Sequence, residues 1–184
     1  MAAERHGRRR SLQHAARAAA ALVGGGLALA ACSSAPSSPG VGAVLTAASG
    51  SRSVQLNLVA AATGANSGFN FDGYCSGAMT VSVPVGWRVV VTCENASAVF
   101  THSCAIVRDV APGVNGAPLA FAGAEIPNAH SGLQHGDSAT FQFVAAQTGR
   151  YKIACLVTGH ELDGMWDWFV VSAGGRPHVS YAKR

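Results

Sequence analysis

Three side chains in one short segment could together bind a soft metal ion. Cys155, His160 and Met165 follow one another at intervals of five residues, and Gly159 and Gly164 stand directly before the second and the third. A thiolate, an imidazole and a thioether select copper over hard cations, and two histidines, one cysteine and a weak axial methionine are the ligands of an electron-transfer copper. Residues 155–165, called the ligand loop below, therefore predict a copper site that needs one further histidine.

His102 is the best candidate for that second histidine. It begins a predicted strand and would enter the fold at the end where the ligand loop lies. His130 and His135 stand in polar loops, which is typical of solvated surface histidines, and they are the alternatives to His102. The expected site binds one copper ion (Cu+/Cu2+) through His102, Cys155, His160 and Met165.

Each of these residues taken alone would suit an ordinary structural role, since a lone Cys or Met is usually packed in a core. Their joint spacing on one loop favours a metal. Structural zinc sites use closely spaced Cys or His pairs and rarely a thioether, and the sequence has no Cys-x2-Cys or His-x3-His pair. Enzymes with several copper ions need His-x-His pairs, which are also absent. We therefore expect an electron carrier and not an enzyme; a periplasmic copper-binding or delivery protein, with exchangeable Cu+, is the alternative.

Hydrophobic and polar residues alternate along much of the chain after residue 52. Val54, Leu56 and Leu58 have polar neighbours, as do Val81 and Val83, and this period of two indicates half-buried strands. Further predicted strands span 87–94, 103–108, 139–145, 150–155 and 166–172. Short strands in this number, about seven or eight, predict an all-β, antiparallel sandwich or barrel. We expect one domain at 53–174 and a C-terminal tail at 175–184.

The N-terminus has the features of a secretory signal. Arginines precede an apolar run at 18–31 that is too short to span a membrane, and Leu29-Ala30-Ala31-Cys32 resembles a bacterial lipobox, where cleavage leaves a lipidated cysteine. We expect a lipoprotein signal peptide at 1–31, a lipid anchor at Cys32 and a flexible Ser/Pro/Gly/Ala tether at 32–52. An ordinary signal peptide or an uncleaved anchor is the alternative. The lipid would hold the protein at the outer, extracytoplasmic face of the bacterial cell membrane.

The basic charge of the chain belongs to this signal. Five of the 13 Lys and Arg residues lie in the first 17 residues, where Glu4 is the only acid. The remaining basic and acidic residues balance, so the mature protein is near neutral and we expect no nucleic-acid partner.

An oxidising compartment would allow one disulfide among Cys75, Cys93 and Cys104. Three pairings are open. We favour Cys75 with Cys93, because these two residues flank a predicted hairpin centred near residues 85–86.

Apolar residues surround the ligand loop, namely Leu156, Val157, Leu162 and Trp166. We expect them to keep water off the metal and to form a docking patch for a redox partner protein around the edge of His160. Ordinary packing over the end of the sandwich is an equal alternative.

From about residue 54 to residue 172 the chain resembles the sulfocyanins, a group of cupredoxins, and the spacing Cys-x4-His-x4-Met is also that of the rusticyanins. The similar segments are 69–74 (FNFDGY), 79–87 (MTVSVPVGW), the segment around His102 and the ligand loop with Trp166. The resemblance implies a cupredoxin-type Greek-key β-sandwich and a type 1 (blue) copper.

The resemblance also implies a mobile carrier of single electrons in a respiratory chain, which receives them from a respiratory donor and passes them toward a membrane terminal oxidase. We expect this carrier to be a monomer. Two features depart from the family pattern: Phe-Thr precedes the first histidine in place of the frequent Leu-Pro, and three extra cysteines are present.

Overall fold

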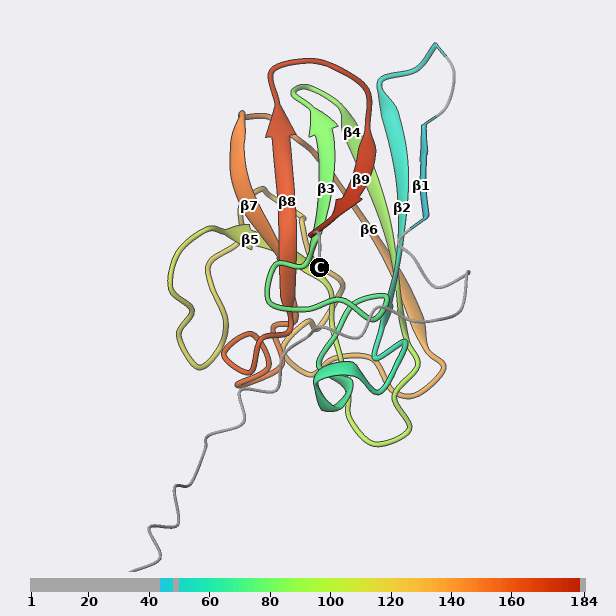
Figure 1. Cartoon of the computed structure of the whole chain (residues 1–184), viewed down its shortest axis with the longest axis vertical. Coiled ribbons are helices and arrows are strands. Elements are labelled where there is room, and N and C mark those ends of the chain that lie inside the picture. The colour runs from blue at the N-terminus through green and yellow to red at the C-terminus, as the bar shows by residue number, and fades with distance from the viewer. Residues whose placement is uncertain (1–43, 48–49, 183–184) are drawn as a thin grey trace, which may run out of the picture.

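Two β-sheets packed face to face make up residues 44–47 and 50–182, the part of the chain that our computed structural model describes (Figure 1). One sheet has the strand order β1-β2-β4-β6 and the other β5-β7-β8-β3-β9. The strands are β1 (Val44–Ala47), β2 (Ser53–Ala60), β3 (Met79–Pro84), β4 (Arg88–Asn95), β5 (Ala105–Arg108), β6 (Ser138–Val144), β7 (Gly149–Ala154), β8 (Trp166–Ser172) and β9 (His178–Tyr181). Within these residues the only helical segment is the short 3-10 turn η1 (Ala65–Gly68). No helix in this part of the chain is long and apolar enough to cross a membrane.

The predicted all-β sandwich is confirmed, with two differences. Each sheet contains one parallel pair, β2 with β4 and β3 with β8, while the other neighbours are antiparallel. The β2–β4 pair can be parallel because β3, which lies between these two strands in the chain, belongs to the opposite sheet. The described residues also form nine strands where seven or eight were expected.

The two additional strands lie in segments that we expected to be tether and tail. Strand β1 pairs with β2 at one edge of its sheet, and β9 pairs with β3 at an edge of the other. Both are four residues long, too short for an alternation of buried and exposed side chains to be recognised in the sequence. The predicted signal peptide, Cys32 and residues 33–43 of the tether lie outside the described residues.

Alternating side chains build the core between the sheets. Along β2 the side chains of Val54, Leu56 and Leu58 are buried while Gln55 and Asn57 are exposed. Burial of one such side chain contributes about 1.5–3 kcal/mol to folding. The shared core fixes how the two sheets are placed, and therefore how the loops at their ends meet.

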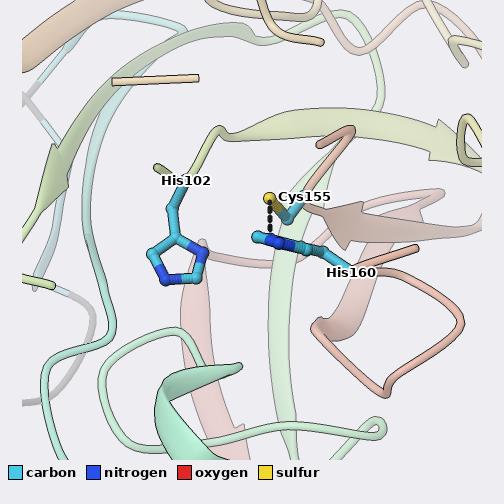
Figure 2. Close-up of side chains that lie close together, drawn as sticks. All are labelled: His102, Cys155 and His160. Carbon is cyan, nitrogen blue, oxygen red and sulfur yellow. Dashed lines mark hydrogen bonds between the residues drawn. The ribbon is translucent and has the colours of Figure 1, made fainter. Parts of the chain in front are cut away.

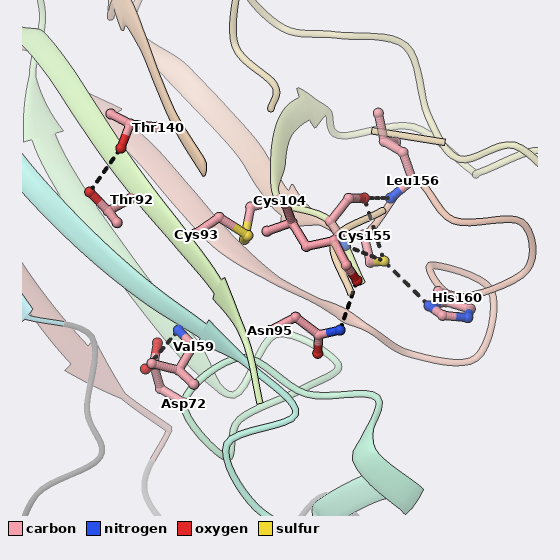
Figure 3. The surroundings of a disulfide bond; sticks show 12 residues. Val59, Asp72, Thr92, Cys93, Asn95, Cys104, Thr140, Cys155, Leu156 and His160 are labelled. Atoms are coloured by element: carbon pink, nitrogen blue, oxygen red, sulfur yellow. Dashed lines mark hydrogen bonds between the residues drawn. A yellow bond between two sulfur atoms is a disulfide. The ribbon is translucent and has the colours of Figure 1, made fainter. Parts of the chain in front are cut away.

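A disulfide joins the two sheets close to His102. Cys93 on β4 is bonded to Cys104, directly before β5, and the two Cα atoms are 5.9 Å apart (Figure 3). Our expectation of a Cys75–Cys93 bond was wrong, because β3 and β4 do not form a hairpin: the turn at 85–86 carries the chain from one sheet to the other. Cys75 is buried and has a bonding partner. Among the described residues the free cysteine is Cys155.

Two carboxyl groups are buried in the body of the sandwich. Asp72 accepts a hydrogen bond from the backbone N–H of Val59 (3.2 Å), and Asp167 on β8 accepts one from Met79 (2.9 Å). The second oxygen of each has no hydrogen-bond partner. Burial raises the pKa of Asp72 to about 7, against a smaller opposing effect of the bond from Val59, and burial raises the pKa of Asp167 well above its usual value.

The buried Asp72 should make the fold more stable in mild acid than at neutral pH. Between the ordinary pKa of 3.8 and the folded value of about 7, the folded protein binds a proton that the unfolded chain does not. The free energy of unfolding therefore falls as the pH rises through this window. Asp72→Asn should lack this dependence. Between pH 4 and pH 7.5 its free energy of unfolding should therefore rise by roughly 2–4 kcal/mol relative to that of the wild type. Urea denaturation at a series of pH values measures the effect.

The exposed Asp137 offers a matched control, since Asp137→Asn should leave the pH dependence of the wild type unchanged. Equal slopes for the wild type and Asp72→Asn would contradict the prediction.

Candidate metal centre

Three buried side chains meet at one end of the sandwich. One donor atom each of His102, Cys155 and His160 lies within 4.8 Å of the other two. Figure 2 shows both imidazole rings beside the sulfur, with Nδ1 of His160 3.3 Å from Sγ of Cys155. In the part of the chain that the structure describes, no other group of His, Cys, Asp and Glu is arranged to hold a metal. The cluster therefore brings together three of the four residues that the sequence singled out.

The ligand loop joins β7 to β8 and is closed by its own backbone. The N–H of Cys155 donates to the carbonyl of Met165 (3.2 Å), and the N–H of Met165 donates to the carbonyl of His160 (2.9 Å). Both ends of the loop are thus held at neighbouring strands of one sheet. Met165, the fourth residue of the predicted set, is fully buried beside the cluster.

Two glycines give the loop its shape. Gly159 has φ +84° and Gly164 has φ +88°, a left-handed backbone that residues with a Cβ rarely adopt. At Gly164 an added Cβ would also lie 2.6 Å from the hydroxyl oxygen of Ser76. The glycines before His160 and Met165 are therefore needed for the turns that direct these residues inward.

His102 comes from the segment between β4 and β5. Its backbone forms a bridge with Leu133, in which the N–H of Leu133 donates to the carbonyl of His102 (2.7 Å). The fully buried amide of Asn95 donates to the carbonyls of Phe100 (2.9 Å) and Leu133 (2.8 Å). Asn95 therefore holds both segments that fix the position of His102. No pattern in the sequence assigns Asn95 a role, because its partners lie 5 and 38 residues away in the chain.

Ser103 links the His102 segment to the ligand loop. Its backbone N–H donates to Sγ of Cys155 (3.2 Å), and its hydroxyl oxygen, 3.6 Å from Sγ, accepts a bond from the N–H of Leu156 (2.8 Å). Burial raises the pKa of the Cys155 thiol; the bonds from Ser103 oppose this shift and the charge of Glu161 adds to it. A buried thiol of this kind is stabilised as a thiolate by a positive ion at the site.

The imidazole of His102 is buried with neither ring nitrogen hydrogen-bonded. Burial, and then the neighbouring His160, lower its pKa to about 4, so the ring is neutral near pH 7 and has a free lone pair. Burial lowers the pKa of His160 as well. An unpartnered buried imidazole next to a thiol suits a metal ion that supplies the missing interaction.

Aromatic rings cover the two histidines. Phe69 packs in an edge-to-face arrangement against both histidines, with its ring centroid 4.8 Å from that of His160 and 6.0 Å from that of His102. It also stacks on Phe100, with the ring centroids 5.4 Å apart. Phe69 is only partly exposed, while Phe100 is 43% exposed. No role was predicted for either ring from the sequence; their contacts with the histidines keep water away from the cluster.

The alternative histidines lie outside the cluster. His130 is exposed, and its Nδ1 is 3.0 Å from the carbonyl oxygen of Leu156, while His135 stands exposed in a turn.

The apolar residues around the ligand loop are divided between core and surface. Leu162 is 54% exposed, and Val157 and Trp166 are half-buried. Leu156 is buried against Gly116, so this member of the expected docking patch does not reach the surface.

The donors present suit one copper ion. Thiolate, imidazole and thioether are soft or borderline ligands, and the Cys-His-His set with a buried methionine beside it is that of a blue copper site. A zinc site would be expected to use further thiolate or imidazole ligands, and none is at hand among the described residues.

Comparisons with known proteins give the same assignment. Residues 41–180 match the model of the sulfocyanin (SoxE) domain. Sulfocyanin of Sulfolobus acidocaldarius is 26% identical over 132 residues, which are 67% of this chain and 66% of that protein, slightly under two thirds of its length. A crystal structure of rusticyanin variants is similar in fold, with a TM-score of 0.54 and 19% identity over 71% of this chain and 87% of that one. The chain therefore belongs to the sulfocyanin (SoxE) domain family of cupredoxins.

Proposed function

We propose that this protein is a type 1 copper electron carrier in an extracytoplasmic respiratory chain. The observation that carries the proposal is the buried Cys155–His102–His160 cluster, which has a single metal position and is closed over by Phe69 and Phe100. Such a site can exchange an electron without binding a substrate. We assign His102, Cys155 and His160 as equatorial ligands and Met165 as the axial ligand.

A bound copper ion supplies a one-electron couple between Cu+ and Cu2+. The protein contributes a ligand arrangement that changes little, because each ligand is fixed from behind. Leu133 and Asn95 hold the segment of His102, Ser103 holds Cys155, and the loop backbone holds His160 and Met165. A rigid arrangement reduces the rearrangement that accompanies each transfer.

Partner proteins would dock on the apolar end of the sandwich. Besides Leu162, the exposed residues there include Phe100, in ring contact with His160 at 6.4 Å, and Val114, whose carbonyl accepts a bond from Gly159. We propose that these side chains, with Val157 and Trp166, make up the docking patch, which suits a transient contact with a respiratory donor or a membrane oxidase.

We further propose that lipid at Cys32, exposed after removal of residues 1–31, holds the protein as a monomer at the outer face of the cell membrane. The lipobox sequence supports this. Copper delivery is the weaker function for this site, because burial under aromatic rings favours retention over exchange of the metal.

The copper-loaded protein should show the intense visible charge-transfer band of a blue site, and Cys155→Ser should abolish it because the thiolate is the electron donor of that band. His102→Ala should also lose the band, whereas His130→Ala, at an exposed position, should keep it. Absorption spectra with a potentiometric titration measure both colour and reversibility. A colourless wild type that binds copper would contradict the electron-transfer function.

Met165→Gln should retain copper but lower its reduction potential. The amide oxygen is a harder donor than the thioether and favours Cu2+ over Cu+. Potentiometric titration of the variant measures the shift, and an unchanged potential would show that Met165 is not the axial ligand.

Cys32→Ser should move the mature protein from the membrane fraction to the soluble extracytoplasmic fraction, because it removes the only acceptor for the lipid. Fractionation with mass spectrometry of the N-terminal peptide measures this. The neighbouring variant Ser33→Ala should remain with the membrane. A wild-type N-terminal peptide that begins elsewhere, or that begins at Cys32 without lipid, would exclude the lipid anchor.

A further inference from the structure

A buried ion pair joins the ligand loop to β7. Nζ of Lys152 contacts Oε1 of Glu161, and the two side chains are only 6% and 1% exposed. The lysine also donates to the carbonyl of Val110 (2.9 Å), and Oε2 of Glu161 accepts from the N–H of Ala117 (2.7 Å). Both charges are therefore paired and hydrogen-bonded with little contact with water.

The Lys152–Glu161 pair connects the segment of His160 to the strand that leads into Cys155. Glu161 follows His160 in the chain, and Lys152 lies on β7 three residues before Cys155. The ammonium also lies 5.6 Å from the ring centroid of Trp166, the residue after Met165. Through these contacts the loop segment of His160 is held against β7 and against the segment at 110–117.

Stability alone does not account for this arrangement. Desolvating two charges costs several kcal/mol per ion, and apolar residues of similar volume in such a place often leave a fold as stable or make it more so. A fixed charge in a water-poor environment does, however, act strongly on other charges nearby. Glu161 is close enough to the site for its charge to act on Cys155. The charge of Lys152 and the charge of Glu161 therefore cancel each other's effect on the metal, and removal of one leaves the effect of the other uncompensated.

We propose that Lys152 and Glu161 form a charge-compensated clamp in which Glu161 is a positioning residue for His160 and the balance of the two charges sets the reduction potential of the copper. This inference rests on the electron-carrier function proposed above. It predicts opposite effects on the copper when the two halves of the clamp are removed separately.

Reduction potentials of the copper-loaded wild type and four variants test the clamp. Glu161→Gln leaves an uncompensated ammonium, which favours Cu+, and should raise the potential. Lys152→Met leaves an uncompensated carboxylate and should lower it. The double variant should lie closer to the wild type than either single variant. Asp109→Asn breaks the exposed Arg150–Asp109 pair, whose side chains are 60% and 31% exposed, and should leave the potential unchanged because water screens the remaining charge.

Shifts in the same direction for both single variants, or no shift, would overturn the electrostatic part of the proposal. A single variant that is too unstable to purify is replaced by the double variant, which leaves no unpaired charge. That variant should release copper to a chelator several-fold faster than the wild type, and an unchanged release rate would overturn the clamp. If the wild type is blue and reversibly reduced but the variants keep its potential and its rate of copper release, only the clamp is rejected. A colourless copper-loaded wild type would instead reject the electron-carrier function on which the clamp rests.

Discussion

The contact between Ser103 and Cys155 is the interaction on which the metal centre depends. It joins residues 52 positions apart in the chain, one beside His102 and one at the start of the ligand loop. Ser103 donates its N–H to the sulfur and accepts the N–H of Leu156, so the segment and the loop approach each other in one relative position. It aligns ligands from two different connections, because His102 lies between β4 and β5 whereas His160 lies between β7 and β8.

The surrounding fold makes this contact reproducible. The disulfide between Cys93 and Cys104 ties β4 to the segment that carries Ser103, and Asn95 at the end of β4 holds the same segment through the carbonyl of Phe100. Figure 3 shows the disulfide, the Asn95 side chain and the Cys155–His160 pair in neighbouring positions. A covalent bond and hydrogen bonds therefore restrain the residues next to His102. Without them the segment between β4 and β5 could move away from Cys155.

Local patterns in the sequence were enough to predict most strands and the ligand loop. The alternation along β2 and the spacing of Cys155, His160 and Met165 each involve only neighbouring parts of the chain. The disulfide could not be predicted in this way. Its pairing depends on which sheet each strand joins, and β3 and β4, adjacent in sequence, belong to different sheets. The roles of Asn95 and Glu161 also depend on distant partners, so no local pattern contains them.

Buried polar atoms without a hydrogen-bond partner occur both in the metal site and outside it, but the two cases differ in how the missing interaction can be replaced. In the described residues, buried side-chain atoms without a hydrogen bond occur only in His102, Asp72 and Asp167. A carboxyl group can lower this cost by taking up a proton, as the raised pKa of Asp72 indicates. The neutral imidazole of His102 cannot do so, since burial lowers its pKa and protonation would bury a charge. Its remaining means of satisfaction is a metal ion shared with Cys155 and His160, so the orphaned ring is itself an argument for the copper site.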